Sequence, residues 1–424
     1  MGNSLTRGLA HGRALLASGD FLTAARLRTA AALVLVYGAA SAGAAYLASP
    51  DGLRDPTGVP FGPDMLAFWT AGRLAAEGGA MLAYDAAAGA RFQADLIGAD
   101  SLPFLPFLHP PQFLFVALLL AQLPFVAAFA LFSGATMAAW IAAAAAFART
   151  RGAALMLAAA PAALIALKYG QAAFLLSALF TGALMSLQRR PLLSGALFGL
   201  MAFKPQYGLL IPVALAAGGC WRAVAGAAAM ILIQTIITGA AFGWDVFARF
   251  AEQAAFARAA VFEQGAGAWA TNFTLYGALA LWGAGPVLAY AAQAALALFL
   301  GLRVASLWRS GADFRLKAAG LMIAAFLATP YALEYDAVLL LPPVLLLWSL
   351  GAERGFAPFV KALLAAAWIA PLFAAPLAGA TGVPAAFLAA AGLFGAVEAM
   401  RRQAGERAAP ARPVLAPARG AAHG

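Results

Sequence analysis

The chain has 424 residues, of which 64% are hydrophobic and only 10% are charged, whereas roughly a quarter of the residues of a soluble protein are charged. No soluble core could bury so much apolar surface, so we expect lipid to be the solvent. The formal net charge of +10 does not indicate a nucleic-acid partner, because arginines at the cytoplasmic ends of membrane spans produce the same excess. The single cysteine and three scattered histidines argue against disulfides, thiolate clusters and a zinc site, and we predict neither a metal nor a cofactor.

The N-terminus carries a basic segment and then an apolar run. Residues 1–28 contain four arginines, and residues 29–49 are apolar. The many apolar runs that follow favour a retained anchor over a cleaved signal peptide. Because basic residues are held on the cytoplasmic side, we place residues 1–28 in the cytoplasm.

Residues 50–109 form a polar stretch with the opposite charge bias. Residues 51–108 contain seven acidic and three basic side chains, so we predict a large first extracytoplasmic loop. Asp64 precedes a segment whose apolar residues share one helical face, which is typical of a helix at the membrane interface with Trp69 at headgroup level. A second helix is predicted to start at Asp85 as N-cap and to end near Gly98.

Further apolar runs recur as far as Glu398, with basic residues on alternate sides of them. This alternation predicts one all-α polytopic membrane domain over residues 29–400, with about twelve crossings and a range of about 10–13. The turns predicted to be cytoplasmic are Arg149–Arg151, Arg189–Arg190, Trp221–Arg222, Arg303–Lys317 and Glu353–Lys361. The turns predicted to be outside are Lys168–Gln171, Lys204–Gln206, Gly243–Asn272 and Thr329–Asp336.

Two stretches depart from regular spans. Pro111–Phe147 is too long for one span and short for two, so we expect one net crossing with a broken or re-entrant start. Leu192–Phe203 is shorter than the ~20 residues that a straight crossing needs. Short helices that meet at polar breaks are tolerated only where the backbone lines a cavity, so the outer ends of the bundle are predicted to form a site. Residues 401–424 are predicted to be a disordered basic cytoplasmic tail.

Asp64 has two interpretations. A carboxylate at the outer edge of the bundle can act as a general base that takes a proton from a hydroxyl. Alternatively, Asp64 only caps the helix that follows it. The two roles are compatible, since a capping aspartate is held rigid.

Lysine is rare in this chain. Of the 27 basic residues only four are lysines, Lys168, Lys204, Lys317 and Lys361. Where composition favours arginine, a lysine indicates a need for a compact point charge. Lys168 and Lys204 lie at neighbouring outer turns, each within three residues of a glutamine, and could bind a lipid phosphate. The alternative is that they snorkel at helix ends, although such residues favour the cytoplasmic side.

Other polar residues near the outer ends of spans also have two interpretations. His109 could contact a phosphate or a sugar, or it could be a structural residue. Glu334 and Asp336 could bind sugar hydroxyls or solvate a turn. Asn272 lies beside aromatic residues that could stack on a sugar or belong to an interfacial belt.

Six short segments, in order along the chain, resemble the marks of glycosyltransferase family 87, which includes polyprenol-phosphate-mannose-dependent mannosyltransferases. The segments are Asp64–Arg73, Leu82–Asp85, His109–Gln112, Tyr169–Gln171, Phe203–Gln206, and Ala328–Tyr331 with Tyr335–Asp336. The similarity covers roughly residues 29–350 and depends on the ordered set rather than on any one motif.

The resemblance implies a GT-C fold whose large first outer loop carries an acidic catalytic residue. It also implies inverting transfer of a hexose, first of all mannose, from a polyprenyl-phosphate donor to a lipid or glycan acceptor, at the outer face of a bacterial inner membrane. Asp64 matches the loop acid. The predicted donor-phosphate ligands are Lys168, Lys204 and Arg73, and the predicted substrate contacts are His109, Gln112, Gln171, Gln206, Asn272, Tyr331, Glu334 and Asp336. The chain departs from the family pattern at Lys168, where asparagine is frequent, and at Phe68–Trp69, where a Phe-Tyr pair is frequent.

Two other classes of protein remain open. A secondary transporter is also a many-span bundle with broken helices and charges at membrane level, but the acidic first loop and the lack of a repeat argue against it. A non-catalytic partner in envelope assembly is the third possibility. It predicts that Asp64 tolerates replacement by asparagine, whereas the enzyme interpretation predicts loss of activity.

Overall fold

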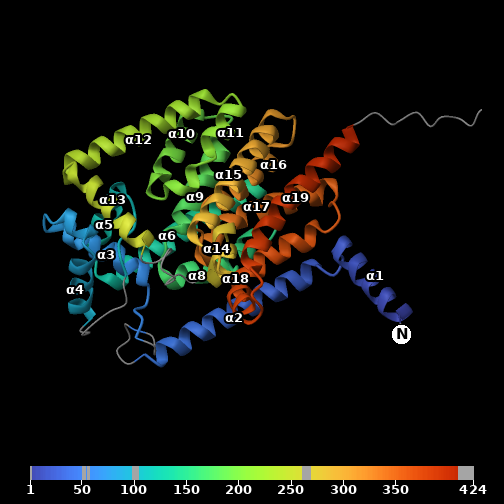
Figure 1. Cartoon of the computed structure of the whole chain (residues 1–424), viewed down its shortest axis with the longest axis horizontal. Coiled ribbons are helices and arrows are strands. Elements are labelled where there is room, and N and C mark those ends of the chain that lie inside the picture. The colour runs from blue at the N-terminus through green and yellow to red at the C-terminus, as the bar shows by residue number, and fades with distance from the viewer. Residues whose placement is uncertain (1, 50–53, 55–57, 98–104, 260–268, 409–424) are drawn as a thin grey trace, which may run out of the picture.

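The computed structural model describes residues 2–49, 54, 58–97, 105–259 and 269–408 (Figure 1). Within these residues every regular element is a helix, and the one β-bridge, Arg54 to Pro60, belongs to no strand. The prediction of an all-α chain is therefore confirmed for this part of the molecule.

The first half of the chain consists of two N-terminal helices, the helices of the first loop and a series of mostly short helices. They are α1 (Gly2–Ser18), α2 (Ala24–Leu47), α3 (Pro63–Ala76), η1 (Ala80–Tyr84), α4 (Ala86–Ile97), η2 (Pro111–Phe113), α5 (Leu114–Leu120), α6 (Phe125–Ala148), α7 (Ala153–Ala158), α8 (Pro161–Tyr169), α9 (Ala173–Ser186), α10 (Pro191–Leu200), η3 (Met201–Phe203), η4 (Pro205–Gly208) and α11 (Ile211–Ala217).

The second half contains most of the long helices. They are α12 (Trp221–Phe242), α13 (Asp245–Ala257), η6 (Trp269–Thr271), α14 (Leu275–Leu281), α15 (Pro286–Arg309), α16 (Phe314–Ala328), η7 (Glu334–Leu340), α17 (Leu341–Arg354), α18 (Val360–Thr381) and α19 (Ala385–Ala408).

Six helices in the described part of the chain are long and apolar enough to cross a membrane: α2, α6, α12, α15, the continuous unit η7–α17, and α18. The apolar window of η7–α17 is 83% buried, against 11–39% for the other five. The unit η7–α17 is therefore the most buried of these six helices, and it begins at Glu334, the first of the two predicted outer carboxylates.

The stretch Pro111–Phe147 is broken as predicted. η2 and α5 form a short first part, residues 121–124 interrupt the helix, and α6 follows as a long apolar helix. α5 does not point freely into lipid, because it packs against α3 of the first loop. A Cβ on Gly72 of α3 would lie 2.0 Å from the carbonyl oxygen of Ala117, so only glycine permits this close approach of the two helices.

The prediction for the first loop helix is wrong in one respect. α3 does not expose its apolar face to lipid, because residues from Met65 to Leu74 are buried nearly all round. Trp69 is only 8% exposed, and its Nε1 donates to the carbonyl of Leu123 at 2.9 Å. The apolar face thus packs on protein instead of lipid. The second loop helix is as predicted: Asp85 Oδ1 accepts from the backbone N–H groups of Ala87 and Ala88 at 2.9 Å each.

Several boundaries differ from those predicted. The first span begins at Ala24 rather than Thr29, because the helix runs through the basic flank. The turn predicted as Arg303–Lys317 contains only residues 310–313, since α15 continues to Arg309. α19 continues to Ala408, so the start of the predicted disordered tail at 401 is wrong. The rest of the tail lies outside the described residues.

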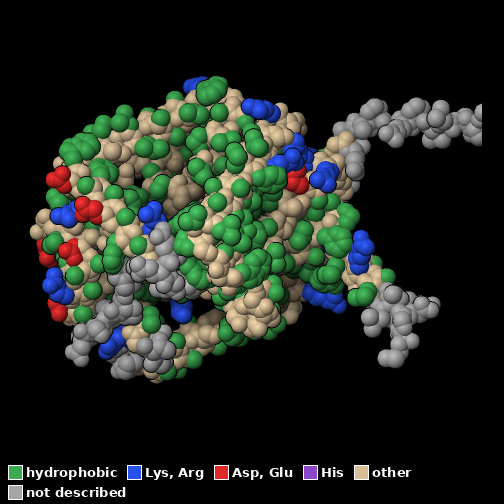
Figure 2. All heavy atoms as spheres, in the orientation of Figure 1, with side chains coloured by type: hydrophobic (Ala, Val, Ile, Leu, Met, Phe, Trp, Pro, Cys, Tyr) green, Lys and Arg blue, Asp and Glu red, His purple; other side chains and the backbone are tan. Residues whose placement is uncertain are grey.

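Charged side chains are unevenly distributed over the molecule (Figure 2). Most of the acidic side chains in this view gather, with several Lys and Arg side chains among them, at the end that carries α3, α4 and α13, whereas Lys and Arg dominate the opposite end, near α16 and α19. The surface between the two ends is mostly apolar, as expected for a face in contact with lipid.

Candidate active site

Asp64 is the second residue of α3. The N-cap is Gly62, which has a left-handed conformation and makes no side-chain cap, so the interpretation of Asp64 as the helix cap is wrong. The Asp64 side chain is partly exposed, and its Oδ2 accepts from Gln171 Nε2 at 3.0 Å. Helix capping therefore does not explain the residue, whereas a hydrogen bond to the bundle fixes its direction.

Gln171 comes from the predicted outer turn between α8 and α9. Its Oε1 accepts from the backbone N–H of Ala172 at 2.8 Å, which leaves Nε2 to donate to Asp64. Gly170 precedes it with φ +67°, and a Cβ there would lie 2.5 Å from Met65 Cβ. Glycine thus permits both the left-handed turn and its contact with α3. The turn is also bonded to α3 through Gly62 N–H and the carbonyl of Lys168 at 3.2 Å.

Lys204 and Asp336 form a buried ion pair beside Asp64. Lys204 Nζ lies 2.7 Å from Asp336 Oδ1, and each side chain is 7% exposed. Asp64 interacts electrostatically with both of them. The structure therefore brings a carboxylate, an ammonium and a second carboxylate together from three distant segments of the chain.

The protonation of Asp64 is shifted by these surroundings. Loss of hydration raises the pKa of Asp64 from 3.8 to about 7, and the charge of Asp336 adds to the increase. The Lys204 charge and the Gln171 hydrogen bond oppose it. A general base is most effective when its pKa lies near the working pH, so Asp64 has the protonation behaviour that this role requires.

His109 lies in an aromatic cluster next to this site. Its ring centroid is 4.6 Å from that of Phe113, 4.8 Å from Phe68 and 6.1 Å from Phe203. Burial and the nearby charge of Lys204 hold the pKa of His109 well below its usual range, so the ring is neutral. Both ring nitrogens are buried without a hydrogen-bond partner. The His109 ring thus packs among aromatic side chains, while its two nitrogens stay available for a hydrogen bond to a ligand.

Lys168 and Glu334 lie at the exposed rim. Lys168 is exposed, its Nζ lies 5.8 Å from the ring centroid of Tyr169, and it interacts electrostatically with Glu334. Tyr169 in turn interacts with both Glu334 and Asp64. Lys168, the other lysine predicted to bind the donor phosphate, therefore lies at the edge of the site and interacts with it through Glu334 and Tyr169.

The structure gives the remaining predicted residues other neighbours. Arg73 lies nine residues after Asp64 in α3, about 14 Å along the helix axis, and its Nη2 is 3.6 Å from Glu77. Gln112 donates to Thr235 Oγ1 at 3.5 Å. Asn272 Oδ1 accepts from Thr274 N and Oγ1, and the Tyr331 hydroxyl bonds that of Tyr290. Gln206 is partly buried in η4. The roles of these five residues, like those of the other predicted site residues, stay predictions.

Two tyrosines of the site were missing from the predicted set of contacts. The Tyr335 ring centroid lies 5.4 Å from that of Tyr169 and 5.5 Å from Lys204 Nζ, and Tyr335 interacts with Asp64 and Gln171. The sequence contained a signal that could have identified them, because each tyrosine is directly adjacent to a predicted site residue.

Among the residues that the structure describes, no group of three or more His, Cys, Asp or Glu side chains could hold a metal ion.

Comparison with known sequences gives one match. The sequence model of glycosyltransferase family 87 matches residues 107–330, a range that holds His109, Lys168, Gln171 and Lys204. No curated protein and no solved structure matches the chain.

Proposed function

Because the chain belongs to glycosyltransferase family 87, we propose that it transfers a hexose from a polyprenyl-phosphate donor to a hydroxyl of a lipid or envelope-glycan acceptor. Mannose is the first sugar to test. Membership of the family makes the chain a membrane glycosyltransferase, which disfavours the secondary transporter and the non-catalytic assembly partner. The observation that carries the proposal is the partly exposed Asp64, held by Gln171 beside the buried Lys204.

The chemistry is a direct displacement at the anomeric carbon. The acceptor oxygen forms the new bond to this carbon while the bond to the phosphate oxygen breaks, and its electron pair leaves with the phosphate. Asp64 takes the proton of the acceptor hydroxyl. Lys204 and Lys168 stabilise the charge on the departing phosphate, which needs no proton. Arg73 is the third proposed ligand of the phosphate group.

We place this site in a GT-C bundle of about twelve crossings, within a range of about 10–13. The six long apolar helices supply half of that number, and we propose that shorter helices, four of which are apolar over 10–17 residues, supply further crossings. The acidic side chains gathered at the end with α3, α4 and α13 (Figure 2) support an orientation with that end outside. The proposed location is the bacterial inner membrane, with the site facing the periplasm or exterior.

Donor use and stereochemistry test the proposed function. Membranes that express the protein are expected to transfer label from polyprenyl-phosphate mannose, but not from a nucleotide sugar, to native lipid extract. A single displacement inverts the anomeric carbon, so a β-linked donor should give an α-linked product, read by NMR or by linkage-specific glycosidases. Retention at this carbon, or transfer from the nucleotide sugar alone, would exclude the mechanism.

Gln171→Leu is expected to move the acidic limb of the pH profile upward. Gln171 donates to the ionised carboxylate and so lowers the pKa of Asp64; without that bond the pKa rises and the base is deprotonated only at higher pH. kcat/KM should therefore fall most near pH 6.5 and recover in part above pH 8. An unchanged limb with a uniformly lower rate would mean that Gln171 binds substrate and does not tune the base.

A further inference from the structure

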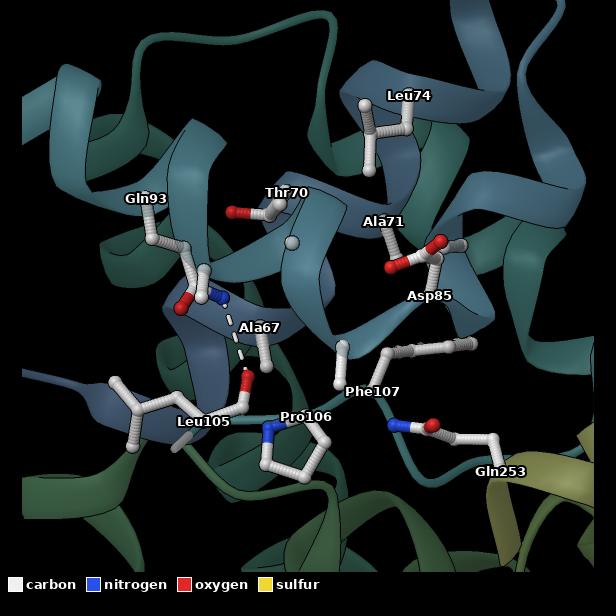
Figure 3. Close-up of a pocket in the computed structure, with 14 residues that line it drawn as sticks. Ala67, Thr70, Ala71, Leu74, Asp85, Gln93, Leu105, Pro106, Phe107 and Gln253 are labelled. Carbon is white, nitrogen blue, oxygen red and sulfur yellow. Dashed lines mark hydrogen bonds between the residues drawn. The ribbon is translucent and has the colours of Figure 1, made fainter. Parts of the chain in front are cut away.

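The first loop contains a second polar site, which we call the α3–α4 notch. Its lining combines Thr70 of α3, Asp85 and Gln93 at α4, Phe107, and Gln253 of α13 with small apolar residues. Figure 3 shows these side chains around one space, with the Gln93 amide bonded to the carbonyl of Leu105. The notch is separate from the Asp64 hydrogen-bond network described above.

Two buried polar atoms in the notch have no partner. Thr70 Oγ1 and Gln93 Oε1 are both without a hydrogen bond, and each residue is 2% exposed. Gln93 Nε2 donates to Leu105 O at 3.2 Å, which fixes the amide so that its oxygen is the free atom. Leaving a buried polar atom without a hydrogen bond is unfavourable, so these two atoms, whose residues line the same space, indicate a polar ligand group.

The free atoms and the charge define that group. A hydroxyl can donate to Gln93 Oε1 and accept from the hydroxyl of Thr70. An anion is disfavoured, because the described lining has one acidic and no basic side chain. The space open to a water-sized group is about 10 Å³, enough for one hydroxyl or hydroxymethyl oxygen. A whole sugar ring does not fit, and the donor phosphate has no partner here.

The position of the notch relates it to the transfer reaction. Thr70 follows Asp64 by six residues in the same helix, about 9 Å along its axis. That rise alone exceeds one sugar ring, so a group bound at the notch belongs to a sugar beyond the one that is glycosylated. Resting on the proposed function, we propose that the notch binds a hydroxyl of the acceptor glycan, on the sugar next to the one that is glycosylated. The preferred acceptor is then a glycan of at least two residues.

The test compares Thr70→Val with wild type, using octyl α-mannoside and octyl α-dimannoside as acceptors. Val has nearly the shape of Thr and lacks the hydroxyl. Thr70→Val should raise KM for the dimannoside about fivefold to tenfold and leave kcat and the monosaccharide KM unchanged. Thr70→Ser should restore the wild-type KM. Thr181→Val is the matched control, because Thr181 is also buried with an unpartnered hydroxyl but lies in α9.

Other outcomes overturn the proposal in distinguishable ways. Unchanged KM values for both acceptors would mean that the notch holds only a buried water, and equal losses with both would mean a structural role for Thr70. If the wild type transfers to neither probe, the proposed function fails for these acceptors. Binding of the dimannoside to the notch is then tested by its effect on the melting temperature. The dimannoside should then raise the Tm of wild type but not of Thr70→Val, and equal shifts would reject the notch as a sugar site.

Discussion

Asp64→Asn is expected to lower kcat on the order of 10³-fold while the protein stays folded. The amide has nearly the same shape and can still accept from Gln171 Nε2, so the position of the side chain is kept. What is lost is the capacity to take a proton from the acceptor hydroxyl. Labelled transfer in membranes at equal expression measures the effect. Asp95→Asn, an exposed change in the same loop, is the control and should keep full activity.

The thermal stability of Asp64→Asn tests the role of Asp64 independently of activity. The pKa of Asp64 is raised from 3.8 to about 7 in the folded protein, so ionising Asp64 opposes folding. Its favourable contribution is full below pH 3.8 and disappears as the pH rises through about 7. Asparagine removes that cost, and at pH 8 the variant should melt at or above the wild-type temperature. Loss of both activity and stability would indicate a structural role.

The wild-type pH profile should follow from the same shift. Since the base acts only when ionised, kcat/KM should rise with pH through about 7 and then level off. A rate that is already maximal at pH 5 would show that the acting group has an ordinary carboxylate pKa and would remove Asp64 from this role.

The sequence identified most members of the site but not how they pair. Asp64, Gln171, Lys204 and Asp336 stand out because polar residues near membrane spans are costly and need a reason. Their partners lie far along the chain: Gln171 is 107 residues from Asp64, and Asp336 is 132 from Lys204. Such pairs depend on how the helices are arranged, which local spacing does not contain.

The wrong predictions concern residues whose surroundings are formed by distant parts of the chain. Periodicity found the apolar face of α3 but could not show that α5 rather than lipid covers it, since both present hydrocarbon. Asp64 looked like an N-cap because aspartate is common there, whereas Gly62 occupies that position with a left-handed backbone. Tyr335 belonged to a segment that resembles the family but was given no role at the site, because aromatic residues near membrane interfaces are common.

Breaking the ion pair of Lys204 and Asp336 is expected to have the second large effect on activity. Lys204→Met should abolish transfer and also destabilise the protein by about 3–5 kcal/mol, because it leaves the buried carboxylate of Asp336 without its partner. A single variant therefore cannot separate binding of the phosphate from stability. The double variant Lys204→Met/Asp336→Leu removes both charges, and replacing a buried pair by apolar residues is often neutral.

We expect the double variant to regain wild-type thermal stability but to stay at least about 10²-fold less active, because the charge that stabilises the leaving phosphate is still missing. The control is Arg303→Met/Glu398→Leu, which removes the pair joining α15 to α19, where Arg303 Nη2 lies 2.5 Å from Glu398 Oε2. It should keep activity. If the Lys204 double variant is as active as wild type, the pair only holds η7 against the turn between η3 and η4, and Lys168 at the rim must carry the phosphate. If it is stable and inactive, the pair is not merely structural, and at least one of Lys204 and Asp336 acts in the transfer itself.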